Sequence, residues 1–363
     1  MDFGPQVASI RPEIDAAIAR VLDSGWFVLG PEVEAFEREL AASFAMSGSV
    51  GVANGTEAIE LALSALGIGA GDEVVTSPMT AAFTALAILH VGAKPVFADL
   101  DPDTLNVSPE AIARVITPRT KAILPVHLYG HPADLDPILQ LARERGIAVI
   151  EDACQAHGAL YKGRPVGSWA GVAALSFYPT KNLGCLGDGG AVLVEGEGLR
   201  ERVRRLRNGG QSDRYRHELP GINSRLDEMQ AAILRVKLKK LEGWTERRRG
   251  LAALYARELS GLPLRLPSEK SYARAVYHLY VVRHPRRDAL AAFLKERGVA
   301  TLIHYPIPLH LQPAFAGTGA VGAFPIAETA AREILSLPLY PELTDDQVRR
   351  VAEVVREFFR TEQ

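Results

Sequence analysis

Cysteine is scarce in this sequence, and neither a surplus of one charge nor a long apolar run is present. The 363 residues contain two cysteines, Cys154 and Cys185, which excludes a disulfide framework and favours a reducing compartment. Lys and Arg total 41 against 43 Asp and Glu, and without a basic surplus the chain is a poor nucleic-acid binder. No apolar run reaches the roughly 18 residues of a membrane span, and residues 1–6 lack the basic and apolar regions of a signal peptide. We therefore expect a soluble, cytoplasmic protein without a nucleic-acid or membrane partner.

The composition is that of an ordinary globular chain, 47% hydrophobic and 23% charged, and at about 150 residues per domain its length indicates two domains. Over the first two thirds, short apolar runs typical of strands alternate with amphipathic runs typical of helices. This alternation predicts an α/β fold in which helices cover both faces of a parallel sheet. The expected strands are Val50–Ala53, Glu73–Thr76, Pro95–Ala98, Ala122–Val126 and Ala148–Ile150, and the expected helices are Pro12–Leu22, Pro31–Phe44, Glu57–Leu66, Ala81–His90 and Leu135–Arg145.

The last third has a different pattern. A long helical run, Leu226–Leu241, is followed by a charged cluster at 246–249 and a second helical run, Leu251–Leu259. A strand-like run at Tyr277–Val282 and helical runs at Asp288–Arg297 and Asp345–Phe359 then complete the chain. We expect a large domain over residues 1–244 and a smaller α+β domain over residues 245–363.

Three segments that follow predicted strands contain the residues with chemical potential, because ligands of open parallel sheets bind beyond the carboxyl ends of the strands. The first is Asn54-Gly55-Thr56, where a strand turns into a helix. Glycine permits close backbone approach, and the first N–H groups of the helix are available to an anion. The alternative is a simple helix cap with no ligand.

The second segment, from Glu151 to Gly158, begins with two acids at the end of a buried strand. A buried carboxylate is costly unless it has a partner, and a cationic ring nitrogen would be one. The alternative is a structural carboxylate that caps the following loop. A metal site built from Glu151, Asp152 and His157 is disfavoured, because the spacing matches none of the common ligand patterns.

The third segment, Leu175–Gly190, contains Lys181 in an apolar and aromatic neighbourhood, and Ser176 five residues earlier. Desolvation would lower the pKa of this lysine and permit Schiff-base chemistry, whereas the alternative is an exposed loop lysine. An anion cradle, a strand-end acid and a desolvated lysine together are what pyridoxal 5′-phosphate (PLP) requires: a phosphate site, a partner for the ring nitrogen and a Schiff-base amine.

These segments resemble the DegT/StrS-type sugar aminotransferases, of the aspartate-aminotransferase fold type. The resemblance extends from Gly30–Glu37 to Leu335–Thr344 and is most specific at Glu151–Gly158 and around Lys181. It implies a mixed, mainly parallel sheet flanked by helices, with Lys181 as the Schiff-base lysine and proton shuttle. It further implies a homodimer with shared active sites, in which the neighbouring subunit contributes an asparagine matched here by Asn223. The implied cofactor-binding residues are Gly55, Thr56, Asp152, Gln155, Ser176, Lys181 and Asn223.

One position departs from the family pattern. Relatives place an aromatic ring over the cofactor in a segment of the form Thr-aromatic-x-Ala-Thr, whereas this chain has Thr80-Ala81-Ala82-Phe83-Thr84. Phe83 is two residues beyond Ala81, about 200° around a helix, and is expected to face elsewhere. The expectation is weaker cofactor retention, or a ring supplied by another segment.

The resemblance also indicates a substrate. Gln155–Gly158, Lys181–Gly184 and Gly187–Gly190 are similar to enzymes that aminate C3 of nucleotide-linked keto sugars, such as dTDP-3-keto-6-deoxyhexoses, with glutamate as the implied amino donor. Amination at C4 or of a cyclitol ketone are alternatives, and a non-catalytic PLP-binding regulator is an alternative of a different class. A sugar dehydratase is disfavoured, because relatives with that activity have His in place of Lys181. The candidate substrate contacts are Trp26, Phe27, Tyr178, His304 and His310, while a plain structural role is an equal alternative for the two histidines.

Overall fold

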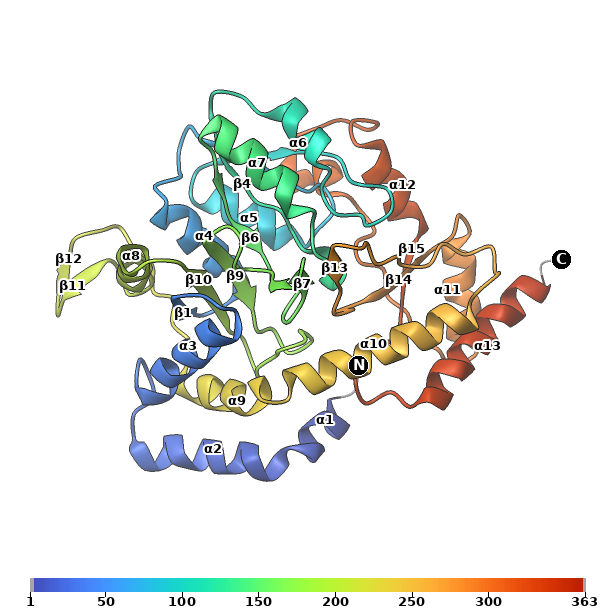
Figure 1. Cartoon of the computed structure of the whole chain (residues 1–363), viewed down its shortest axis with the longest axis horizontal. Helices are drawn as coiled ribbons and strands as arrows, with labels where there is room; N and C mark the ends of the chain where they lie inside the picture. The colour runs from blue at the N-terminus through green and yellow to red at the C-terminus, as the bar shows by residue number, and fades with distance from the viewer. Residues whose placement is uncertain (1–2, 362–363) are drawn as a thin grey trace.

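The structure, a computed structural model that describes residues 3–361, is built around a mixed β-sheet (Figure 1). One half consists of β2 (Glu73–Thr76), β3 (Lys94–Phe97), β4 (Thr120–Ile123) and β5 (Ala148–Val149), which are parallel in the order β3-β2-β4-β5. The other half consists of β1 (Gly48–Val52), β6 (Glu151–Asp152), β9 (Val172–Ser176) and β10 (Gly190–Val194), in the order β1-β10-β9-β6. Only Ile150 separates β5 from β6, and Val126 bridges Asp152, so the halves form one sheet.

Strand direction confirms the expected mixed, mainly parallel sheet. β6 and β9 are parallel, whereas β10 runs antiparallel to both β9 and β1. Because β1 and β9 are each antiparallel to β10, they point the same way. The loops that follow β1, β2, β4, β6 and β9 therefore emerge at the same edge of the sheet.

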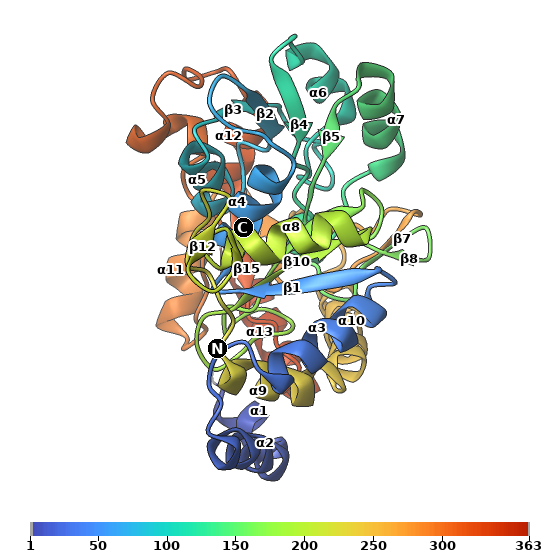
Figure 2. The same cartoon turned by 90° about the vertical axis from the view of Figure 1, so that its left-hand side faces the viewer.

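Helices cover both faces of the sheet, as the alternating pattern predicts. On one face α4 (Gly55–Ala65), α5 (Ala82–His90) and α8 (Glu197–Arg207) share an apolar cluster with the strands. On the other face lie α3 (Pro31–Ser43), α6 (Pro109–Val115), α7 (Leu135–Arg145) and α9 (Glu228–Leu238). Figure 2 shows β1 between α8 and α3. The helix α2 (Arg11–Ser24) packs outside α9, and the short helix α1 (Gly4–Ser9) precedes it.

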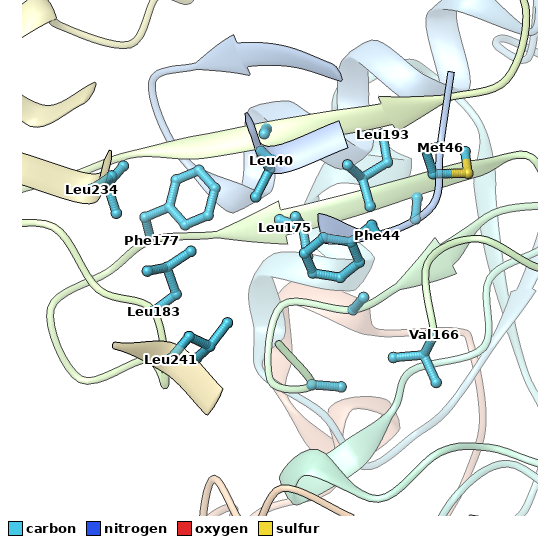
Figure 3. Close-up of a cluster of buried hydrophobic side chains, with 14 of the residues drawn as sticks. Leu40, Phe44, Met46, Val166, Leu175, Phe177, Leu183, Leu193, Leu234 and Leu241 are labelled. Atoms are coloured by element: carbon cyan, nitrogen blue, oxygen red, sulfur yellow. The ribbon is translucent and has the colours of Figure 1, made fainter. Parts of the chain in front are cut away.

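The apolar cluster beneath α3 and α9 anchors the loop that contains Lys181. Figure 3 shows Leu40 of α3 and Leu234 of α9 facing Leu175 and Phe177, the residues at and just beyond the end of β9. Phe177 is fully buried and packs edge-on against Phe36, with the ring centroids 5.4 Å apart. The position of the loop is thus set by side chains of the core.

The C-terminal part has its own core. The long helix α10 (Leu241–Glu258) and the helix α11 (Arg287–Glu296) both pack against α13 (Asp345–Thr361), and they share an apolar core with the antiparallel pair β14 (Tyr280–Arg283) and β15 (Ile334–Leu337). α10 runs without a break across the expected boundary at residues 244 and 245, so the division into two domains stays a prediction. The smaller elements are η1 (Leu128–Gly130), β7 (Leu160–Tyr161), β8 (Arg164–Pro165), β11 (Gln211–Asp213), β12 (Arg216–His217), β13 (Ala273–Arg274), η2 (Leu309–Leu311), η3 (Pro313–Phe315) and α12 (Pro325–Glu333).

A buried carboxylate from α9 caps α3. The N-cap residue of α3 is Gly30, which has no side chain to offer, and Glu228 accepts from the backbone N–H groups of Gly30, Glu32 and Val33 at 2.8–2.9 Å. Replacing Glu228 by Gln puts an amide donor against buried N–H donors, and should lower the free energy of unfolding by about 1–3 kcal/mol. Denaturant unfolding measures this. The control is the exposed Glu34→Gln in the same helical turn, for which we expect a change within about 0.5 kcal/mol; equal values for both variants would contradict the capping role.

Candidate active site

Residues from all three predicted segments meet at the edge of the sheet where β1, β6 and β9 end. At the first of these ends, Asn54 is the N-cap of α4, and its side chain accepts from Glu57 N at 2.9 Å. Gly55 and Thr56 are therefore the first two residues of the helix, and their N–H groups have no acceptor within it. Gly55 packs directly on Ser176, because a Cβ at Gly55 would lie 2.6 Å from that of the serine. The N-terminus of α4 and the hydroxyl-bearing end of β9 thus form one small polar surface.

The two acids at the start of the second segment have different surroundings, because successive residues of a strand face opposite ways. Glu151 is fully buried, and its carboxylate accepts from four N–H donors at 2.6–3.1 Å. Three are the backbone N–H groups of Gly167, Trp169 and Ala170, and the fourth is Nε2–H of His127, whose Nδ1 accepts from a backbone N–H. Glu151 is therefore the structural carboxylate that caps a following loop.

Asp152 points toward the site. Its Oδ2 accepts from the Thr84 hydroxyl at 2.8 Å, and its Oδ1 accepts from Cys154 N at 3.1 Å. Thr84 lies on α5 and also contacts the hydroxyl of Thr80. These bonds fix the orientation of a buried carboxylate that makes no salt bridge with any of the described residues. Such a carboxylate is suited to a cationic group brought by a ligand.

Lys181 sits on a tight loop between β9 and β10. Its backbone N–H donates to Tyr178 O at 2.8 Å, and Cys185 N donates to Phe177 O at 2.8 Å. A Cβ on Gly184 would approach Pro179 O to 2.4 Å, so the loop requires glycine there. The buried ammonium of Lys237 donates to Gly184 O at 2.7 Å. The backbone around Lys181 is thus fixed by these hydrogen bonds and by the close packing at Gly184.

Burial lowers the pKa of Lys181, and the nearby Cys154 and Asp152 oppose that shift without cancelling it. An amine with a lowered pKa is more often unprotonated near neutral pH, which is the form that adds to a carbonyl. The Cys154 thiol itself has a pKa raised well above its usual value by burial and by Asp152, so it is the neutral neighbour in this group.

Gln155 joins the sheet edge to the C-terminal part of the chain. Its Oε1 accepts from Tyr129 N at 2.8 Å, and its Nε2 donates to the Tyr305 hydroxyl at 3.1 Å. The Tyr129 hydroxyl in turn donates to His304 O. Burial raises the pKa of Tyr305 to about 12, so its hydroxyl stays protonated. An aromatic side chain from a distant segment therefore enters the site.

The candidate substrate contacts separate into two groups. His304 is partly buried, with Nδ1 2.9 Å from Ser336 Oγ, and its pKa is lowered by burial and by the nearby Lys181. Phe27 and Tyr178 are about half exposed. His310 is buried away from this group, with Nε2 3.1 Å from Glu328 and its ring against Phe324. The structure does not bring it together with the others.

Two further expectations concern Asn223 and Ala81. Asn223 is exposed on the stretch that follows the β11–β12 hairpin, and the next residue, Ser224, accepts from Ala53 N at 3.0 Å. Ala81 is the N-cap residue of α5, and Phe83 is 62% exposed, which agrees with its expected outward orientation. No described group of three or more His, Cys, Asp or Glu side chains is arranged to hold a metal ion.

The residues present fit PLP. Gly55 leaves room where a Cβ would collide with Ser176, beside free helix N–H groups that suit a phosphate. Asp152 offers a buried carboxylate, and Lys181 a desolvated amine.

Substituting Gly55 tests this cradle. The added Cβ of Gly55→Ala would force α4 and Ser176 apart, and overpacking of this kind costs about 1–3 kcal/mol; we expect the affinity for PLP to fall by roughly 5–150-fold. Titrating the apoprotein with PLP measures it. Gly243→Ala, on α10 with no atom within 4 Å of the new Cβ, is the control, and unchanged PLP affinity in Gly55→Ala would exclude the cradle.

Comparisons with known proteins identify the family of this chain. A model of the DegT/DnrJ/EryC1/StrS aminotransferase family matches residues 8–356. This chain belongs to that family. Aminotransferases of the family use PLP, and solved structures of two similar proteins are described as PLP or PMP forms.

Two relatives illustrate the range of names within the family. The chain is 50% identical over 360 residues to a Streptomyces venezuelae protein named dTDP-3-amino-3,4,6-trideoxy-alpha-D-glucose transaminase, covering 99% of this chain and 95% of the relative. It is 47% identical to a Geobacillus stearothermophilus protein named pleiotropic regulatory protein, covering 99% and 98%. Its structure matches a crystal structure of S. venezuelae DesV in complex with a ketimine intermediate, with a TM-score of 0.97, 50% identity and coverage of 98% and 97%.

Sequence reasoning did not find Thr84, Tyr129 or Tyr305. Thr84 lies in the first turn of the predicted helix Ala81–His90 and Thr80 directly precedes that helix, and this pair of hydroxyl residues is a signal that was available. Tyr129 and Tyr305 reach Gln155 from segments 26 and 150 residues away, and no local pattern reveals such contacts.

Proposed function

We propose that this protein is a PLP-dependent aminotransferase that transfers an amino group from glutamate to C3 of a nucleotide-linked keto sugar of the dTDP-3-keto-6-deoxyhexose type. The observation that carries the proposal is the meeting of Asp152, Lys181 and the Gly55–Ser176 cradle at one edge of the sheet. The sugar and its C3 position rest on the relative that is 50% identical. Two free cysteines support a cytoplasmic location, and no described helix is long and apolar enough to cross a membrane.

When bound, PLP supplies a carbonyl that links covalently to amines and a ring that withdraws electrons from them. The N-terminus of α4, with Gly55, Thr56 and Ser176, would hold its phosphate. Asp152, oriented by the Thr84 hydroxyl, would pair with the protonated ring nitrogen, and Gln155 would lie beside the ring hydroxyl.

Lys181 acts twice in the proposed reaction. Its Nζ would be the amine that holds the cofactor covalently, and when it is not so engaged the unprotonated amine would take the proton from the α-carbon of the amino donor. In the second half of the reaction it returns a proton to C3 of the sugar. Holding the cofactor and taking a proton both need the unprotonated amine, which the lowered pKa of Lys181 favours, whereas returning a proton uses the ammonium that carries it.

The substrate would bind between Lys181 and the His304–Tyr305 segment. His304 has Nδ1 engaged with Ser336, so its Nε2 is the nitrogen left for a sugar hydroxyl. Tyr178 lies three residues before Lys181, and since the rings of Tyr178 and Phe27 are both about half exposed, we propose them as further contacts of the sugar nucleotide. His310, which Glu328 holds away from this region, is not among the proposed contacts.

We include a homodimer in the proposal. Exposed apolar side chains gather around the start of α9: Phe27 accepts through its carbonyl from Glu228 N, and Leu186 donates through its N–H to Gln230. The β11–β12 hairpin projects from the body of the molecule (Figure 1), and Asn223 follows it. A partner would cover this surface and receive Asn223 at its phosphate site.

Mixing the inactive variants Lys181→Ala and Asn223→Ala should then restore activity that neither has alone; no recovery would contradict shared sites.

Assay against a panel of nucleotide sugars tests the substrate. We expect amination of dTDP-linked 3-keto sugars in the presence of glutamate, with the new amine at C3 by NMR. Faster turnover of 4-keto sugars or of a cyclitol ketone would replace the proposed acceptor. A relative named as a regulator raises the non-catalytic alternative, and it would gain support if the protein bound PLP and turned over none of these ketones.

A further inference from the structure

The residue after Lys181 is tied to a distant segment through both ends of its side chain. Asn182 is buried, its Nδ2 donates to Val276 O at 3.1 Å, and its Oδ1 lies 3.3 Å from Nδ1 of His278. Because an amide oxygen only accepts, the hydrogen is assigned to Nδ1 of His278. The loop of Lys181 is therefore bonded to residues 275–279, the segment that leads into β14.

The same segment is wedged against the residues around Gln155. Val276 N donates to Gly130 O at 2.9 Å. A Cβ on Gly130 would lie 2.8 Å from Cγ2 of Val276, 2.9 Å from His278 N and 3.1 Å from Gln155 O, so glycine is needed for this contact. Segment 275–279 thus touches the neighbours of both Lys181 and Gln155.

Two arginines of α10 contact the backbone carbonyls of segment 275–279. Arg249 donates to Ala275 O at 2.7 Å, and Arg248 contacts Tyr277 O at 3.4 Å and donates to Leu339 O at 3.1 Å. Tyr277 has a φ of +45°, a left-handed conformation that non-glycine residues adopt only when their surroundings impose it. The segment is fixed from three directions.

The groups facing Lys181 are mostly neutral bases. His157, His278 and His304 all have lowered pKa values, each chiefly because of burial and in part because of Lys181. A neutral His278 retains the Nδ1–H that Asn182 accepts. Arg248 also lowers the pKa of His278, and Asp152 and Cys154 face the lysine from the opposite side.

We propose that Asn182 and His278 are positioning residues for Lys181: their hydrogen bond, backed by segment 275–279, holds the lysine in register with Gln155 and with the cofactor. This inference rests on the proposed function, since it assigns the two residues to the same lysine. Neither side chain needs to touch a substrate, and their effect is exerted through the backbone of the lysine loop.

Four variants test it. Asn182→Ala and His278→Leu remove the bond, whereas His278→Asn retains a donor near the position of Nδ1. The control is His131→Leu, which removes another buried histidine, bonded to Pro132 O and approached by Lys270 N. A displacement near 1 Å costs about 10²-fold in rate, so we expect kcat to fall by about that factor in the first two variants, with KM for glutamate little changed. His278→Asn should recover most of the loss.

A second readout separates positioning from general stability. Visible circular dichroism of the bound cofactor, scaled to cofactor content, reports how it is held, and we expect it to fall in Asn182→Ala and His278→Leu but not in His131→Leu. If kcat and this signal fall no further than in His131→Leu, or if His278→Asn recovers neither, the inference is wrong. If wild-type protein shows no cofactor signal at all, the proposed function fails first.

Discussion

Replacing Lys181 by Ala lowers kcat for transamination by about 10²–10⁴-fold, the range expected for loss of a positioned proton-transfer group. No described neighbour can replace it, since the groups around it are a thiol with a raised pKa, a carboxylate, and histidines whose pKa values are lowered. The cofactor should also lose its covalent link to the protein. Single-turnover absorbance with glutamate measures the rate, and mass spectrometry after borohydride reduction measures the link.

Two variants control this result. Lys181→Arg retains a cation and forms no Schiff base, so it should be as inactive as the alanine variant. Lys162→Ala removes an exposed lysine that pairs with Asp136 and should leave activity unchanged. Residual activity within tenfold of wild type in Lys181→Ala would show that another group carries the chemistry.

The second large effect is expected at Asp152, whose substitution should lower activity. Substitution of the adjacent Glu151 should instead lower stability. Asp152→Asn removes the carboxylate available to a ring nitrogen while its other contacts, Thr84 and Cys154 N, can be kept. We expect kcat to fall by about 10²–10³-fold, as for other preorganised polar groups, with little change in stability.

Glu151→Gln is the matched comparison. Its amide group would face buried donors among Gly167, Trp169, Ala170 and His127, and each unsatisfied donor costs about 1–3 kcal/mol. We expect a lower free energy of unfolding and near-normal kcat in the fraction that is folded. Thermal melting measures the stability of the two variants, and steady-state kinetics measures their kcat. Lower kcat in Glu151→Gln together with lower stability in Asp152→Asn would exchange the roles given to the two carboxylates.

Much of the fold follows from local pattern. The periodicity places Glu73–Thr76 and Leu135–Arg145 at the observed bounds of β2 and α7, because apolar strands and amphipathic helices are each determined by nearby residues. The family resemblance implied a mixed sheet, but nothing in the sequence indicated that β10 is the antiparallel strand, since direction depends on how a connection crosses the sheet.

The site is predictable only in part. Asp152, Ser176 and Lys181 stand out because each follows a strand, and parallel strands bring their ends together. The sequence left open which of Glu151 and Asp152 is structural and which faces the site. That assignment depends on the loop at 167–170 folding back onto Glu151. Tyr305 and His278 come from segments far along the chain, and their roles arise only from packing.

The most direct test is the absorbance spectrum of the wild-type protein reconstituted with PLP, recorded before and after addition of glutamate. A visible band of lysine-bound cofactor that glutamate converts to the pyridoxamine phosphate spectrum, with 2-oxoglutarate released in equal amount, is the predicted result. A band that glutamate leaves unchanged would contradict the proposed amino donor, and the absence of any lysine-bound cofactor would contradict the site itself.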